Sequence, residues 1–172
     1  MLLTETTALI HVNPEDAFAY TSDMNNLALW AGGVKSAHLL TPGPMRVGSL
    51  YRCKILSARR GPLAYYQVEE FLPNERLVMR GENAAMFFRD TFLFEPALDG
   101  VLMSIVNELE FRRVRFLLEP FAPAAIRLHQ ERHLAHLKKL LEDAFPPPQP
   151  ASAIENVQLS AGRYSPRGRV YS

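Results

Sequence analysis

Hydrophobic and polar residues alternate through most of the first 112 positions, a pattern typical of strands with one buried face. The first alternating segment covers 4–12 and stops at Asn13-Pro14. Six more segments are separated by turn residues, and they cover 34–40, 48–56, 63–71, 77–81, 87–95 and 101–111. Because consecutive segments are joined by short connections, the pattern predicts a predominantly antiparallel sheet of about seven strands.

Two short helices are expected between the first and second strands. Asn13 can cap a helix from Pro14 to about Tyr20, whose first turn carries acidic residues. Asp23 can cap a second helix over 25–30, which Gly32-Gly33 ends because glycine tolerates the positive φ of a helix exit.

The period becomes helical after residue 111. Apolar and bordering positions then share one broad face, and these are Ile126, Gln130, His133, Leu134, Leu137, Leu141 and Ala144. The spacing predicts a long amphipathic helix over about 124–144.

A proline-rich segment at 146–150 stops this helix, and 151–172 shows little periodicity. We therefore expect a domain of residues 1–145 followed by a linker and tail of residues 146–172. The composition of the tail favours a flexible terminus. The alternative is that Ile154, Val157 and Leu159 pack onto the domain or onto a partner.

Composition narrows the class of protein. Hydrophobic residues make up 48% of the 172 residues and charged residues 22%, as in globular proteins. Nineteen basic and eighteen acidic residues leave a net charge of +1, so we expect no nucleic-acid partner. A single cysteine, Cys53, excludes an intrachain disulfide and suits a reducing compartment. We expect a cytoplasmic protein without a membrane span, since no sufficiently long apolar run or signal-peptide pattern is present.

The order of these elements resembles the START-like helix-grip fold of the SRPBCC superfamily. Five stretches resemble its polyketide cyclase/dehydrase branch in the same order: IHVNPEDAFAYTSDMNNLALW, GPMRVGSLYR, VEEFLPNERLVMR, DTFLFEPALDG and LAHLKKLLE. The resemblance covers roughly residues 4–145. It implies an α+β fold in which a curved antiparallel sheet surrounds the long C-terminal helix and encloses a cavity for an apolar ligand. Members include aromatic polyketide cyclases, lipid carriers and proteins with no known reaction, so the fold alone leaves the function open.

Two polar residues stand on strand faces that are otherwise apolar. Asp90 alternates in phase with Phe88 and Phe92, and Asn107 in phase with Ile105. The Asp99-Gly100 turn predicts that these strands pair, which would bring Asp90 and Asn107 together. Burial would raise the pKa of Asp90 toward values useful for acid-base catalysis, whereas pairing with an inward Arg or Tyr, or a position at a wet cavity mouth, would give it a structural role.

Tyr51 and His133 complete the set of candidate catalytic residues. Tyr51 is expected to point inward beside Cys53, where packing is an alternative role for the tyrosine and a small buried hydrophobe is the simplest role for the cysteine. His129 and His133 lie four residues apart on the long helix, so they could share a proton path or a metal ion, although no further ligand stands at a matching spacing. A solvated helix edge is the alternative for His133, as it is for the neighbouring His136. Neither Tyr65 nor Tyr66 is assigned to the cavity by the pattern.

The leading hypothesis is an enzyme that binds a hydrophobic small molecule and assists cyclisation or dehydration of a polyketide-like intermediate. The expected ligand-binding residues are Trp30, Phe88, Phe92, Phe94, Met103, Ile105, Leu109, His129 and Leu137. Trp30 could gate the cavity or simply close the core. We expect no metal or other cofactor, and a homodimer is kept as a possible assembly. The alternatives are a non-catalytic carrier or sensor of a lipid-like ligand, and an interaction module that uses the tail and the outer sheet face.

Overall fold

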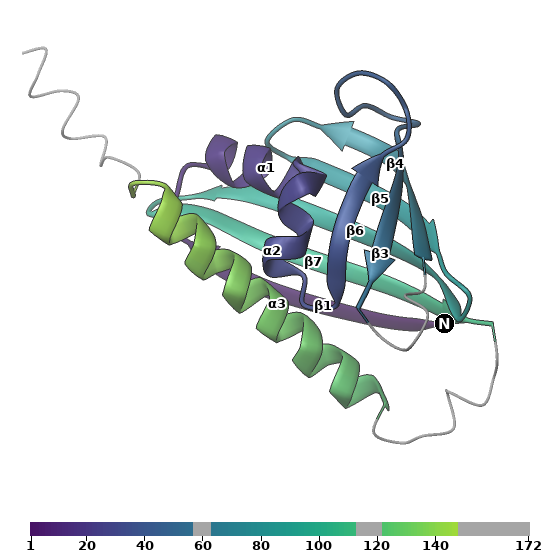
Figure 1. The fold of residues 1–172 in the computed structure, drawn as a ribbon. Coiled ribbons are helices and arrows are strands. Elements are labelled where there is room, and N and C mark those ends of the chain that lie inside the picture. Colours follow the sequence, from purple (N-terminus) through teal and green to yellow (C-terminus); the bar gives the residue numbers. More distant parts are fainter. Residues whose placement is uncertain (57–62, 113–121, 148–172) are drawn as a thin grey trace, which may run out of the picture.

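A seven-stranded antiparallel sheet and three α-helices form the fold (Figure 1). The computed structural model describes residues 1–56, 63–112 and 122–147. The strands are β1 (Leu2–Ile10), β2 (Val34–Leu39), β3 (Leu50–Ile55), β4 (Leu63–Leu72), β5 (Arg76–Glu82), β6 (Met86–Ala97) and β7 (Gly100–Phe111). The helices are α1 (Pro14–Ser22), the 3-10 turn η1 (Met24–Asn26), α2 (Leu27–Trp30) and α3 (Ala122–Ala144).

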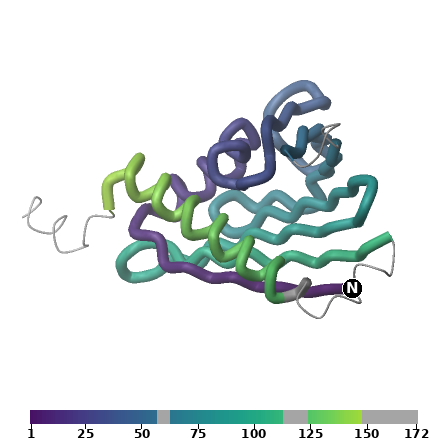
Figure 2. Tube along the Cα trace, turned by 60° about the horizontal axis from the view of Figure 1, so that its bottom comes forward, coloured from purple at the N-terminus to yellow at the C-terminus, as the bar shows by residue number. Residues whose placement is uncertain are grey.

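The strand order in the sheet is β1-β7-β6-β5-β4-β3-β2. Strands β2 to β7 therefore form the predicted meander, and β1 pairs with β7 at the far edge. The sheet bends around the helices, and α3 runs along β1 while α1 and α2 lie beside it on the same face (Figures 1 and 2). This arrangement is the predicted helix grip.

Local sequence explains how the chain turns between β1 and β2. Pro14 stands at the start of α1, but the side chain of Asn13 makes no capping bond and instead donates to the Asp16 carboxylate at 3.3 Å. The predicted Asn13 cap is thus wrong in its chemistry. Asp23 does cap the next segment, because its carboxylate accepts the backbone N–H of Asn25 at 3.0 Å. The predicted second helix is divided into η1 and α2, and Gly33 supplies the positive φ of 122° that follows.

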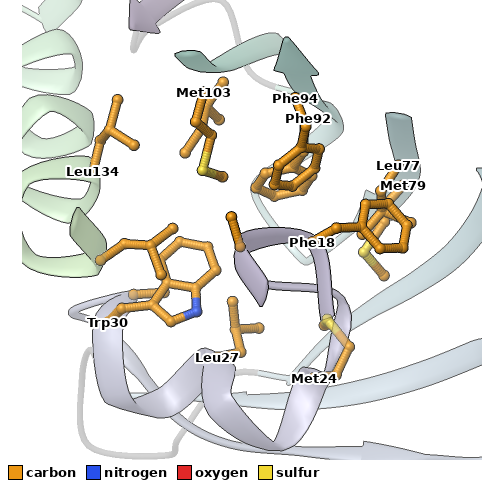
Figure 3. Packing of buried hydrophobic residues seen from close by; sticks show 14 of the residues in the cluster. Phe18, Met24, Leu27, Trp30, Leu77, Met79, Phe92, Phe94, Met103 and Leu134 are labelled. Atoms are coloured by element: carbon orange, nitrogen blue, oxygen red, sulfur yellow. The ribbon is translucent and has the colours of Figure 1, made fainter. Parts of the chain in front are cut away.

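The core lies between the helices and the concave face of the sheet. Figure 3 shows Met24, Leu27 and Trp30 pointing toward Phe92 and Phe94. Leu134, Leu137 and Leu141 of α3 are buried, which confirms their predicted orientation. No helix among the described residues is long and apolar enough to cross a membrane.

Candidate functional site

A pocket of about 160 Å³ lies between the concave face of the sheet, the α1-to-α2 segment and α3. Every one of these elements contributes to its wall. The lining residues are Thr21, Met24, Leu27, Trp30, Ala31, Val34, Tyr66, Leu77, Met79, Asp90, Phe92, Ile105, Asn107, Gln130 and His133. Most of them are apolar, so the few polar groups determine what chemistry the pocket can support.

Asp90 and Asn107 form a polar pair on the sheet floor of this pocket. The two residues are direct partners in the register of β6 and β7, as the alternation and the Asp99-Gly100 turn predicted. The Asn107 amide nitrogen donates to a carboxylate oxygen of Asp90 at 2.7 Å. The neighbouring position on β5 is Met79, so the pair has an apolar flank along the sheet.

Burial raises the pKa of the Asp90 carboxyl to about 6, even though the hydrogen bond from Asn107 favours the ionised form. Asp90 lines the pocket and its side chain is half-buried. Among the described residues no basic side chain is bonded to Asp90, so it is not paired with an arginine as one structural alternative had it. A carboxyl group with this pKa can take up and release a proton near neutral pH.

Tyr66 is the tyrosine that faces the pocket, whereas Tyr65 is exposed on the outer face. Burial, together with the charge of Asp90, raises the pKa of the Tyr66 hydroxyl well above its usual value. Its ring packs against Phe88 with ring centroids 4.8 Å apart. The hydroxyl therefore stays protonated and can donate a hydrogen bond to a ligand.

The α3 wall of the pocket carries His133 and Gln130. A ring nitrogen of His133 lies 3.0 Å from the carbonyl oxygen of Gly32, which joins α3 to the end of α2. Burial lowers the pKa of His133, and the nearby His129 lowers it further, although the Gly32 contact opposes this shift. Gln130 is held by a hydrogen bond with the hydroxyl of Thr4 on β1.

Several predicted site residues line the pocket and others do not. Asp90, Asn107, His133, Trp30, Phe92 and Ile105 are among its lining residues. Tyr51, Phe88, Phe94, Met103, Leu109, His129 and Leu137 are not. All of the second group except His129 are buried.

Three of the predicted residues that do not line the pocket have identified surroundings elsewhere. Phe94 packs against Phe18 of α1 with ring centroids 5.2 Å apart, which keeps it in the core. His129 is exposed and its ring lies 4.0 Å from that of His133. Tyr51 lies by a separate surface groove, and burial, with the charge of Asp23, raises its pKa.

Two more sets of predicted site residues lie outside the lining for similar reasons. Met103 and Leu137 are fully buried in the core. Phe88 and Leu109 face each other across β6 and β7, in the row of the Tyr66 ring. Alternation identifies the face of a strand, but it does not show how far along that face a pocket extends.

Thr21, Gln130 and Tyr66 are polar pocket residues that were not predicted. Tyr66 shares its strand face with Ala64 and Val68, which are both buried, so the phase of β4 would have identified it. Thr21 had no comparable signal, because helix α1 is too short for its periodicity to be decisive.

Two further candidate chemistries are a reactive thiol at Cys53 and a bound metal ion. Burial raises the pKa of the Cys53 thiol to about 12, which fits a small buried hydrophobe rather than a nucleophile. Across 1–56, 63–112 and 122–147, no three His, Cys, Asp or Glu side chains are grouped so that they could hold a metal ion.

The fold is similar to several solved structures of low sequence identity. A START superfamily protein from Mycobacterium smegmatis is 16% identical with a TM-score of 0.63, covering 83% of this chain and 96% of that one. An aromatase/cyclase from Streptomyces sp. R1128 is 11% identical with a TM-score of 0.61, covering 81% and 93% respectively. A protein from Thermus thermophilus is 16% identical with a TM-score of 0.68, covering 83% and 98%.

Comparison with curated proteins gives no match. In contrast, the profile of the family described as polyketide cyclase / dehydrase and lipid transport matches residues 1–142, which is most of the chain. The chain belongs to the polyketide cyclase / dehydrase and lipid transport family.

Proposed function

We propose that the pocket binds a hydrophobic small molecule and that the domain assists cyclisation or dehydration of a polyketide-like intermediate. The observation that carries the proposal is the Asp90–Asn107 pair on the floor of an otherwise apolar pocket. Apolar walls hold the body of a ligand, and a few convergent polar groups orient it. The description of the family supports this class of ligand.

Asp90 is the proposed proton carrier. As a carboxylate, it takes a proton from the carbon beside a bound carbonyl group, and the electron pair left behind forms an enolate. The enolate carbon attacks a second carbonyl carbon of the same ligand, which forms the ring bond and leaves an alkoxide. The proton on Asp90 then passes to this oxygen, so the cyclisation consumes and releases no net proton.

Dehydration needs a second proton cycle at the same group. Asp90 accepts another proton from the carbon next to the new hydroxyl, and this proton leaves with the hydroxyl group as water. The Tyr66 hydroxyl remains a hydrogen-bond donor throughout, so it can hold the enolate oxygen. Asn107 fixes the direction of the Asp90 carboxylate through its amide.

The pocket volume limits the part of a ligand that is enclosed. Typical small-molecule sites measure ~300 to 1,000 Å³, whereas this pocket measures about 160 Å³. An apolar cavity of ~150 Å³ can hold benzene. We infer that a single ring or the reacting end of a longer chain enters the pocket in this conformation.

A carrier function is the second candidate, because the family description also includes lipid transport. In a carrier, Asp90 and Asn107 would orient the ligand without transferring protons. The substitution Asp90→Asn distinguishes the two functions. A catalytic Asp90 predicts retained ligand binding and a ~10²-fold or greater loss of turnover, and an orienting Asp90 predicts weaker binding instead.

Native mass spectrometry of freshly purified protein would identify a retained ligand and supply the substrate for this comparison. The pocket can also be tested before its natural ligand is known, by using NMR to measure the binding of ethylbenzene, a neutral probe. Ile105→Trp should abolish its binding by filling the pocket, whereas Leu3→Trp on the exposed side of β1 should not. Undiminished binding to a folded Ile105→Trp protein would contradict the assignment of the pocket.

A further inference from the structure

Two buried donors on the helix side of the pocket have no partner among the described residues. These are the indole N–H of Trp30 and the hydroxyl of Thr21, on side chains that are 4% and 3% exposed. Both residues line the pocket. Buried polar groups without partners are uncommon, so their occurrence at a pocket wall indicates the chemistry of its ligand.

The types of these groups specify the complementary atom. An indole N–H is a donor only, and a threonine hydroxyl can both donate and accept. An oxygen with two lone pairs can therefore satisfy both groups. An apolar ligand surface would instead leave the Trp30 donor unpaired.

The location of these groups matters as much as their lack of partners. Thr6 also has a buried hydroxyl without a partner among the described residues, but it does not line the pocket. Thr6 lies on β1, opposite Ile105 in the sheet register. It therefore offers a matched comparison in which the same chemical change is made away from the ligand.

Charge restricts the oxygen to a neutral group. The described lining of the pocket contains no lysine or arginine, so no permanent cation would balance a bound anion. Burial lowers the pKa of His133, which disfavours a positive charge there as well. On the opposite floor, an ionised Asp90 would repel a carboxylate or phosphate ligand.

We propose that the Trp30 indole N–H and the Thr21 hydroxyl form a subsite for a neutral carbonyl oxygen, so the pocket selects ketones or esters over carboxylates. The subsite lies on the helix wall, whereas Asp90 and Asn107 lie on the sheet floor. A bound ligand thus has one carbonyl oxygen on the helix wall, while the carbonyl group beside its reactive hydrogen lies near Asp90 and Tyr66 on the sheet side. This inference rests on the proposed function, because it concerns the ligand of the same pocket.

Three single-ring probes test the subsite: acetophenone, ethylbenzene and benzoate. Their affinities are measured by NMR titration for the full chain and for the variants Thr21→Val and Trp30→Phe. Thr21→Val keeps nearly the same side-chain shape, and Trp30→Phe keeps an aromatic ring. In each variant, the ratio of acetophenone to ethylbenzene affinity should fall roughly 3- to 10-fold, the scale of one neutral hydrogen bond.

The ethylbenzene measurement corrects for changes in pocket shape, and thermal unfolding verifies that each variant is folded. The control Thr6→Val should leave the affinity ratio unchanged. If Trp30→Phe does not fold, Thr21→Val decides the result alone. Benzoate should bind more weakly than acetophenone to the unmodified protein.

The outcomes separate this inference from the proposed function. An unchanged affinity ratio in the folded variants, with both neutral probes still bound, would overturn the carbonyl subsite and leave the pocket as a ligand site. Benzoate binding as tight as that of acetophenone would overturn the selectivity for neutral ligands. Failure of the unmodified protein to bind any probe would overturn the subsite and the proposed pocket function together.

Discussion

Asp90 makes the stability of the folded chain depend on pH. Its pKa is about 6 in the folded protein against an ordinary 3.8, so the folded state binds more protons between these values. The free energy of unfolding should therefore decrease as the pH rises from about 4 to about 6, and the loss remains at higher pH. The shift corresponds to ~1 to 3 kcal/mol after allowance for screening through the pocket.

Asp90→Asn removes this ionisation while keeping the shape of the side chain. The variant should gain stability over the unmodified protein between pH 4 and pH 7, and the gain should be close to zero at the lower limit. Urea unfolding at several pH values measures it. A stability difference that does not change with pH would show that Asp90 ionises as an ordinary exposed carboxylate.

Gly81 allows two aromatic rings to meet beside the pocket. It stands between Tyr66 and Phe88 in the register of the sheet, and a Cβ built there lies 2.1 Å from the Phe88 ring and 2.6 Å from the Tyr65 carbonyl oxygen. Gly81→Ala should therefore destabilise the protein by ~1 to 3 kcal/mol or more. Urea unfolding in the unmodified and Phe88→Ala backgrounds tests the cause, since removal of the ring should reduce the effect.

The residue scale also shows how far alternation predicts a site. The phase of β6 and β7 placed Asp90 beside Asn107, because register follows directly from the short turn between the two strands. The same phase correctly placed Phe94 and Met103 on the buried face of the sheet, but neither residue lines the pocket as expected. Phe18 of α1 lies against Phe94, and no periodicity within β6 contains information about that distant contact.

At the scale of elements, α3 is joined to the rest of the domain by polar contacts at both ends of its buried stripe. His133 contacts the Gly32 carbonyl, and Lys138 donates to the Leu9 carbonyl at 2.6 Å. Glu142 accepts hydrogen bonds from the backbone and ring of His11 at 2.9 and 2.8 Å. These contacts align α3 with β1 and α2, and so they set the position of the pocket wall.

Protonation of His133 should occur below its ordinary pKa of 6.5. Burial is the main cause, and repulsion from His129 and His136 adds to it, while the Gly32 carbonyl opposes the shift. His129→Gln should raise the pKa of His133 without returning it to 6.5, because the burial remains. NMR titration of the imidazole carbon-bound protons measures the change. No rise in this variant would show that the neighbouring histidine does not influence His133.

Strands were predicted more accurately than the short helices. The strand segments alternate over many residues and are separated by glycine and proline turns, so their limits differ from the structure by only a few positions. The segment at 24–30 is too short for a helical period, and its division into η1 and α2 depends on packing against the sheet. The failure of the Asn13 cap is similarly local, since Asp16 competes for its amide.

At the scale of the whole molecule, the order of elements was sufficient to predict the grip of the sheet on α3. The depth of the pocket was not predictable in this way, because it depends on how α1, α2 and α3 cover different parts of one sheet face. The described lining of the pocket comes from nine elements of the fold, η1 included. Some of its residues, such as Thr21 and His133, are more than 100 positions apart in the sequence.

At the scale of the whole chain, the described contacts between α3 and the sheet are made by residues that precede the tail of residues 146–172. We therefore predict that the domain folds equally well without the tail. The family profile ends at residue 142, and α3 ends at Ala144. A chain that stops after Pro147 should therefore unfold at the same urea concentration, and with the same denaturant slope, as the full chain.

A second shortened chain makes this comparison decisive. Ending the protein after His136 removes Leu137 and Leu141, both 0% exposed, and should prevent cooperative folding because the sheet face beneath them loses its cover. If the chain ending at Pro147 instead unfolds at lower urea with a smaller slope, the tail buries surface on the domain. Ile154, Val157 and Leu159 would then be the residues to replace with serine in the full chain, and loss of stability in that variant would identify the tail as part of the folded unit.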